Sequence, residues 1–269
     1  MLADAFLLAL RNLKQRKLRT ILTALGIIIG VTAIVSIFLI SEGLENAVTS
    51  QFEEIGSNTL FVLPGSDIFA GQIQQGLTET DIETIEKLSE VEDVFGVIYE
   101  SGEVGYGKEE ELFYYIGGVE PDQVEEKFSS IGVHIAEGRW FSENEKLGLV
   151  VGAKVVDDIF EKEISLKNRV EISEKKFEIV GVLKEIGNSE DDSIIYMSRE
   201  TLYDLFDKNG EISFISMKVK QGLDPDVVAA KVENALEKKR GNDRFEVWTS
   251  EQTLAIFGNI IMIIQFILG

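Results

Sequence analysis

The most apolar stretch of the chain covers residues 21–40, where no side chain is charged. A helix rises about 1.5 Å per residue, so a helix of this length spans roughly 30 Å, the thickness of a bilayer's hydrocarbon core. Beyond it, apolar residues recur at helical spacing at Leu44, Val48, Phe52 and Ile55. The pattern therefore predicts a transmembrane helix over residues 20–40 that continues as a helical stalk over residues 41–58.

Residues 1–19 begin with apolar side chains at helical spacing and end in a cluster of cations. The cations are Arg11, Lys14, Arg16, Lys17 and Arg19. An amphipathic helix on the cytoplasmic surface of a membrane has this pattern, with its cations near anionic headgroups. Because cationic flanks stay in the cytoplasm, we expect a cytoplasmic N-terminus and an extracytoplasmic domain. A cleaved signal peptide is the alternative, but its apolar region is shorter, about 7–15 residues, and a small-residue cleavage site follows it.

Two further patterns concern helices in the membrane. Gly26 and Gly30 lie four residues apart on one helix face, and small residues at this spacing let another helix approach closely. Residues 253–269 again lack charge and are just long enough to begin a second span. This second apolar segment suggests a fragment or a truncated form of a longer membrane protein.

The residues between the apolar segments alternate between strand and helix patterns and predict an α+β domain. A first strand–helix–strand unit combines a strand at 59–63, a helix capped by Thr78, and strands at 94–106 and 112–119. A second unit combines a strand at 212–219, a helix at 225–239 and a strand at 244–248. Two such units predict one subdomain over residues 59–119 and 212–252, which residues 120–211 interrupt.

The inserted residues 120–211 predict a smaller subdomain of mixed α/β structure. Short strands are expected at 147–151, 169–172, 176–183 and 194–197, and short helices at 152–160 and 199–206. Residues 66–76 and the acidic residues 187–192 are expected to form loops.

Charge separates the start of the chain from the rest. The net charge is −21, whereas residues 1–40 carry five Arg or Lys and one acid. The remaining residues therefore carry −25. A domain this acidic repels phosphate backbones, which argues against nucleic acid as a partner.

Residues typical of catalytic or metal sites are scarce. The chain has no cysteine and a single histidine, His134, and it lacks a Walker A sequence and the common hydrolase, zinc-protease and calcium-loop motifs. Two acidic clusters, residues 109–111 and 190–192, lack the ligand spacing of a calcium loop and are interpreted as solvated turns. We therefore predict no catalytic, cofactor-binding or metal-binding residues.

Several segments together resemble the MacB/FtsX-like family of ABC transporter permeases. The most specific is Asn12–Val31 (NLKQRKLRTILTALGIIIGV). Shorter matches are GSNT at 56–59, VLPG at 62–65, IGGV at 116–119, EGRWF at 137–141 and VGVL at 180–183. The resemblance covers essentially the whole chain.

The resemblance implies a permease with four spans and the large domain between the first and second. It implies a Porter-like subdomain of two βαβ units split around the inserted subdomain. It also implies a homodimer, a separate cytoplasmic ATPase subunit and, in some assemblies, an extracytoplasmic adaptor protein. Such permeases relay ATP-driven movement to the outer domain, for efflux or for mechanotransmission without transport. The third and fourth spans are missing here, so this chain alone is not expected to couple to ATP hydrolysis.

Two other functions remain open from the sequence. A membrane-anchored extracytoplasmic binding or sensor domain without a transport role would have the same anchor and acidic domain. A membrane-tethered enzyme would need a catalytic site, and the sequence nominates none. The substrate is not indicated by any residue of 41–252.

Overall fold

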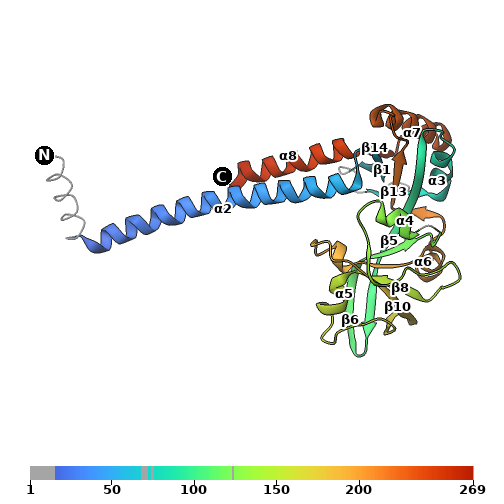
Figure 1. Cartoon of the computed structure of the whole chain (residues 1–269), viewed down its shortest axis with the longest axis horizontal. Helices are drawn as coiled ribbons and strands as arrows, with labels where there is room; N and C mark the ends of the chain where they lie inside the picture. The colour runs from blue at the N-terminus through green and yellow to red at the C-terminus, as the bar shows by residue number, and fades with distance from the viewer. Residues whose placement is uncertain (1–15, 68–71, 74–75, 123, 269) are drawn as a thin grey trace. The chain divides into compact units, whose positions relative to one another are not determined.

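The computed structural model describes residues 16–67, 72–73, 76–122 and 124–268 (Figure 1). The chain divides into two compact units, which are described separately. One consists of Met1–Ser50 with Leu254–Gly269, and the other of Gln51–Thr253.

In the part that the structure describes, two helices supply the first unit: α2 (Lys17–Ile55) up to Ser50, and most of α8 (Ser250–Leu268). The helix predicted over residues 20–40 is confirmed, and it continues without a break to Ile55. It ends three residues before the predicted limit of the stalk because Gly56 has a φ of +87°, the left-handed conformation that terminates helices. The apolar segment 253–269 lies in α8, up to Leu268.

The second unit contains the predicted pair of strand–helix–strand units, and the fold is α+β. Its first subdomain is built from β1 (Thr59–Pro64), α3 (Glu79–Glu86), β5 (Val91–Tyr106), β13 (Phe214–Val219), α7 (Pro225–Arg240) and β14 (Phe245–Thr249). The strands lie in the order β14-β1-β13-β5, and all neighbours are antiparallel. This is the order of a split βαβ fold in which both helices pack on one face. One core joins Leu60 and Val62 of β1 to Ile85 of α3 and to Val232 of α7.

Local sequence explains where the two helices of this subdomain begin. Thr78 caps α3, and the backbone N–H of Thr78 donates in return to the Asp81 carboxylate at 2.8 Å, which completes a capping box. Asp224 caps α7, and Pro225 occupies its first turn, where a missing N–H costs nothing.

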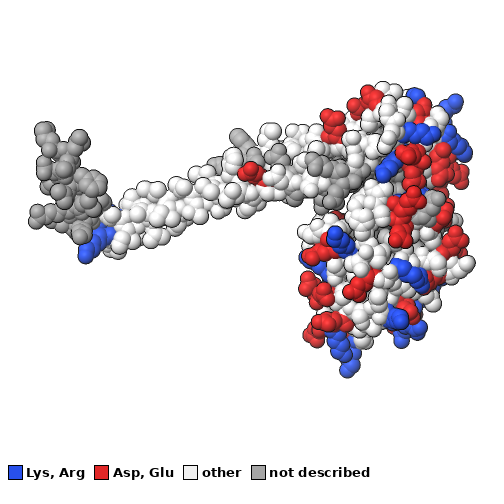
Figure 2. Space-filling view, viewed as in Figure 1, with Lys and Arg blue, Asp and Glu red and all other residues white. Residues whose placement is uncertain are grey.

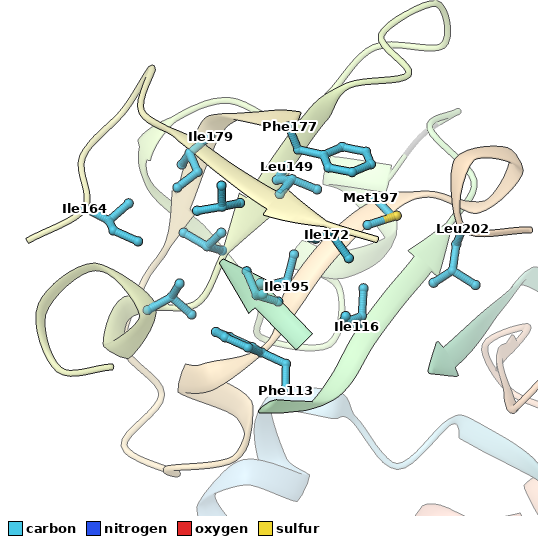
Figure 3. Packing of buried hydrophobic residues seen from close by; sticks show 14 of the residues in the cluster. Phe113, Ile116, Leu149, Ile164, Ile172, Phe177, Ile179, Ile195, Met197 and Leu202 are labelled. Carbon is cyan, nitrogen blue, oxygen red and sulfur yellow. The ribbon is translucent and has the colours of Figure 1, made fainter. Parts of the chain in front are cut away.

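The inserted subdomain extends the same sheet beyond β5. Its elements are β6 (Glu109–Val119), α4 (Val124–Ser129), β7 (Ile135–Gly138), β8 (Gly148–Val151), α5 (Ala153–Asp157), β9 (Arg169–Ile172), β10 (Lys175–Leu183), the 3-10 turn η1 (Asp191–Ser193), β11 (Ile195–Ser198) and α6 (Arg199–Phe206). The order continues β5-β6-β11-β8-β10-β7, and β9 pairs with both β10 and β5. Phe113, Leu149, Phe177 and Ile195 fill its core (Figure 3).

The boundary between the subdomains differs from the predicted one at residue 119. Only residues 91–97 of β5 pair with β13, whereas residues 98–106 pair with β6. Beyond β5, β6 pairs only with β11 among the described strands, and its Phe113 and Ile116 lie in the core of the inserted subdomain. One long strand, β5, therefore serves both cores, and β6 belongs with the insertion.

Smaller differences have local causes. Helix α4 and strand β7 occur where no element is predicted from the sequence. The predicted loop 66–76 contains the short pair of β2 (Ser66–Asp67) with β3 (Gln72–Ile73), and β4 (Leu77–Thr78) pairs with β12 (Glu211–Ile212). The helix predicted at 152–160 ends at Asp157, and Phe160 instead contacts the rings of Phe113 and Tyr106.

Candidate membrane-coupling junction

The surface of α2 is apolar along most of its length. Residues 21–36 and 38–40 are all exposed, although none carries a charge. Figure 2 shows this stretch as white, in contrast to the charged surface of the domain. Among the described residues, one helix, Lys17–Ser50, has the length and composition to cross a membrane. The apolar helix and the type of domain that follows it indicate membrane anchoring.

The structure describes three of the five predicted membrane-surface cations. Arg16, Lys17 and Arg19 are exposed at the start of α2, whereas Arg11 and Lys14 lie outside the described residues. Within the helix, the hydroxyls of Thr20 and Thr23 donate to the carbonyls four residues earlier, at 3.2 and 2.9 Å, so neither needs a polar neighbour.

The two glycines of α2 lie on an open part of the helix surface. A Cβ atom added to Gly26 or Gly30 would meet no atom within 4 Å. In the described part of this unit only Ser41 and Ile261 are buried. No described residue of the chain therefore occupies the predicted helix-packing face.

The start of α8 is held by a reciprocal cap. The backbone N–H of Thr249 donates to the side chain of Gln252 at 3.2 Å, and the N–H of Gln252 donates to the Thr249 hydroxyl at 3.1 Å. This is the capping box of a Thr-x-x-Gln sequence, and it fixes where the last strand becomes a helix. The motif was visible in the sequence, and it would have placed the start of α8 at Ser250 rather than at 253.

Ser250 connects the start of α8 to the segment that follows α2. Its buried hydroxyl lies 3.0 Å from the carbonyl of Gly56 and 2.9 Å from that of Thr59. The adjacent strands agree with this contact, since Leu60 of β1 pairs with Thr249 of β14. The point where the chain enters the domain and the point where it leaves therefore share one hydrogen-bonded site, which we call the junction (residues 56–59 and 249–252).

A second set of hydrogen bonds fixes the junction to the sheet. The side-chain amide of Asn58 donates to the carbonyl of Val219 at 3.0 Å, and the N–H of Val219 donates to the carbonyl of Asn58 at 2.8 Å. These two bonds fix Asn58 to the end of β13, one of the two strands that pair with β1.

The two subdomains are linked by a buried arginine. Arg199, at the start of α6, donates to the carbonyl of Gly96 at 2.8 Å and forms an ion pair with Glu120 at 3.2 Å and a longer one with Glu79 at 3.6 Å. Nearby, the hydroxyl of Tyr203 donates to Glu79 at 3.2 Å, and burial, with the negative charge of Glu79, raises the pKa of Tyr203. These contacts join α6 to α3 and to β5, so they favour movement of the domain as one body.

His134 and the acidic residues 190–192 are the sequence's candidates for chemistry whose surroundings the structure describes. Within the described residues, no group of three or more His, Cys, Asp or Glu could hold a metal ion. His134 is exposed. The prediction that residues 190–192 form a solvated turn is wrong for Asp192, which is buried and accepts backbone N–H bonds from Ile186 at 2.8 Å and from Gly187 at 2.9 Å.

Comparisons with known proteins agree with this architecture. The model of the family described as MacB-like periplasmic core domain matches residues 20–235. The chain is 32% identical over 267 residues to an uncharacterized ABC transporter permease of Methanocaldococcus jannaschii. The alignment covers 99% of this chain and 66% of that protein. It is 26% identical over 263 residues to the macrolide export ATP-binding/permease protein MacB of Bartonella quintana. That alignment covers 92% of this chain and 38% of the relative. The chain thus spans only part of these relatives.

Solved structures share the fold at low sequence identity. The periplasmic region of MacB from Actinobacillus actinomycetemcomitans aligns with a TM-score of 0.64 and 20% identity, over 79% of this chain and 98% of that one. The extracellular domain of the transporter YknZ from Gram-positive bacteria aligns with a TM-score of 0.56 and 21% identity, over 71% of this chain and 100% of that one.

Proposed function

Because the chain belongs to the family of the MacB-like periplasmic core domain, we propose that it is part of the permease subunit of a MacB-type ABC transporter. In this role residues 20–40 of α2 span the cell membrane with the N-terminus in the cytoplasm, and the domain lies outside. Arg11, Lys14, Arg16, Lys17 and Arg19 anchor the cytoplasmic side to lipid headgroups. The proposal places the ATPase activity in a separate cytoplasmic subunit, and homology to an ABC transporter permease supports an ATPase partner.

The junction is the observation that carries this proposal. The Ser250 hydroxyl lies within hydrogen-bonding distance of both Gly56 and Thr59, directly after α2 and at the start of α8. Helix displacement in the membrane reaches the sheet at this point, and the Asn58–Val219 bonds pass it on. The chain then relays ATP-driven movement to the outer domain, for efflux or for mechanotransmission.

The remaining parts of the proposal concern assembly. Gly26 and Gly30 form a face without Cβ atoms, where a helix of the longer permease or of a second copy packs. Residues 253–269 begin the second span. The full-length permease works as a homodimer, and an adaptor protein contacts the extracytoplasmic domain.

A distance measurement in the assembled complex tests the relay. The full-length permease is co-purified with its cytoplasmic ABC ATPase in nanodiscs, with a spin label at Ser101→Cys in each copy. Binding of ATP is expected to change the label-to-label distance, and Ser250→Ala is expected to reduce that change. Distances that do not respond to ATP would contradict the relay. Failure to co-purify with any ABC ATPase would favour an anchored binding or sensor domain without a transport role.

A further inference from the structure

Part of strand β6 forms an open edge of the sheet. Residues 116–119 pair with β11, whereas residues 109–113 pair only with β5 among the described strands, and residues 114–115 lie at an irregularity of the β5–β6 register. The other side of β5 is covered at residues 104–105 by β9. The long β5–β6 hairpin (Figure 1) therefore presents one free edge. Unpaired strand edges are templates for pairing with another chain.

The register of the hairpin identifies the backbone groups at this edge. The two-residue turn at 107–108 is closed by the pair Tyr106–Glu109, which is the hydrogen-bonded type of pair. Because hydrogen-bonded and non-hydrogen-bonded pairs alternate, the N–H and C=O groups of Glu110 and Leu112 point away from β5. They are available to an added strand.

A groove of about 610 Å³ runs beside this edge. One wall consists of residues 111–115 of β6, and the other of Ile159, Ser189, Glu190 and Ser193. Leu112 is 54% exposed and Tyr114 is 71% exposed on the open face. Large apolar side chains this exposed on an antiparallel edge are typical of a binding surface rather than of a solvated strand.

Among the described residues, the charged side chains that line the groove are acidic. Glu111 and Glu190 line it, and no described lysine or arginine does, although the Lys154 ammonium donates to the hydroxyl of the lining residue Ser189 at 3.0 Å. Glu110 is exposed on the same strand. An apolar groove with a negative rim complements a segment that combines apolar residues with lysine or arginine.

We propose that this groove binds an extended segment of an extracytoplasmic partner protein, which adds as a strand to residues 109–115 of β6. Backbone hydrogen bonds to the free edge supply affinity, and contacts with Leu112 and Tyr114 and with the acidic rim supply specificity. The inference does not depend on the transport of a substrate, and it places the partner surface on the inserted subdomain, away from the junction residues.

Peptide binding to the full chain in detergent micelles tests this proposal. The probe is a fluorescein-labelled synthetic peptide of alternating valine and threonine with two lysines at each end, and its affinity is measured by fluorescence anisotropy. Saturable binding is expected. A peptide with glutamates in place of the lysines should bind at least about tenfold more weakly, as should one with N-methylated amides on one edge.

Matched variants locate the binding site. Leu112→Ser and Tyr114→Ser are expected to weaken binding at least about tenfold, and Leu147→Ser, at a position that is also 54% exposed but outside the groove, should leave it unchanged. Glu111→Lys with Glu190→Lys should abolish binding, whereas Glu233→Lys with Glu237→Lys on α7 should not. Circular dichroism checks that each variant folds.

Three results would overturn the proposal. The first is no saturable binding of the lysine peptide, and the second is equal binding by the glutamate peptide. The third is self-association of the chain that Leu112→Ser and Tyr114→Ser abolish, because a second copy of the chain would then occupy the groove.

Discussion

The same side chain has opposite surroundings in the two units of this chain. Ile28 of α2 is 62% exposed, whereas Ile195 of β11 is fully buried. In the domain, other core side chains of the chain cover Ile195. On α2, no described residue covers residues 21–36.

This difference shows that the described residues of the chain do not cover the apolar surface of α2. Burying a large aliphatic side chain contributes about 1.5–3 kcal/mol relative to leaving it in water. A helix with more than ten such side chains exposed would therefore be strongly unfavourable in water, and it is favourable in a lipid bilayer. The domain is stabilised by its own packing, whereas the exposed apolar surface of α2 agrees with membrane anchoring.

The largest effect is expected at the buried ion pair of the domain. Arg240 and Asp81 lie 2.5 Å apart with side chains that are 8% and 2% exposed, and Asp81 also completes the cap of α3. Asp81→Ala leaves the guanidinium buried without this carboxylate, so we expect a loss of about 3–5 kcal/mol in the free energy of unfolding. Urea unfolding of the full chain in micelles, followed by the fluorescence of Trp140 and Trp248, measures it.

The exposed pair Lys146–Glu200 is the control for that variant. Both side chains are more than half exposed, so Glu200→Ala should change the same free energy by no more than about 1 kcal/mol. Equal losses in the two variants would show that burial does not govern ion pairs in this domain.

Two isoleucine variants compare how much a side chain of each unit contributes to the stability of the domain. Ile195→Ala creates a cavity in the inserted core and should cost about 2–5 kcal/mol in urea unfolding of the domain. Ile28→Ala should leave the unfolding of the domain unchanged, because Ile28 packs on no described part of the chain. A loss at Ile28 as large as that at Ile195 would mean that α2 is covered by protein.

An intermediate effect is expected at the junction. Ser250→Ala removes a buried hydroxyl that lies near two carbonyls, and the lost hydrogen bonding should cost about 1–3 kcal/mol. Hydrogen exchange should increase first at residues 56–59 and at the start of α8. Unchanged protection there would remove the junction as a coupling point. Ser101→Ala, at an exposed serine, is the matched control.

The smallest effect concerns pH. The hydrogen bond from Lys231, with a smaller contribution from Ser89, lowers the pKa of Glu90 from its ordinary value of 4.5 to about 2. Because the pKa is lowered on folding, this contribution to stability is present above pH 4.5 and is lost as the pH falls toward 2. Glu90→Gln should therefore differ from the unmodified chain above pH 5 and converge with it near pH 2. A constant difference in unfolding free energy over this range would contradict the assignment.

Elements with a strong local pattern were predictable from sequence. The uncharged run at 21–40 predicted α2, and Thr78 and Pro225 marked the starts of α3 and α7. The order of the two strand–helix–strand units followed from their repetition along the chain. The resemblance to the permease family, drawn from short motifs such as residues 12–31, is confirmed by the family match over residues 20–235.

Features that depend on distant partners were not predictable. Ser250 bonds to residues 191 and 194 positions earlier in the chain, and no local pattern indicates that contact. Asp192 lies in an acidic run typical of a surface turn, yet it is buried because it caps two backbone N–H groups. Strand β6 has the pattern of the first subdomain but belongs to the second, because β5 is long enough to serve both cores.

The location of the two ends of α2 relative to the membrane is the most direct test of the account. The chain has no cysteine, so single cysteines can be introduced without background labelling. In intact cells, a membrane-impermeant maleimide should label Ser101→Cys in the domain, and it should label Gln15→Cys only after the membrane is permeabilised. Labelling of both positions in intact cells, or of Gln15→Cys alone, would contradict a membrane-spanning α2 with an extracytoplasmic domain.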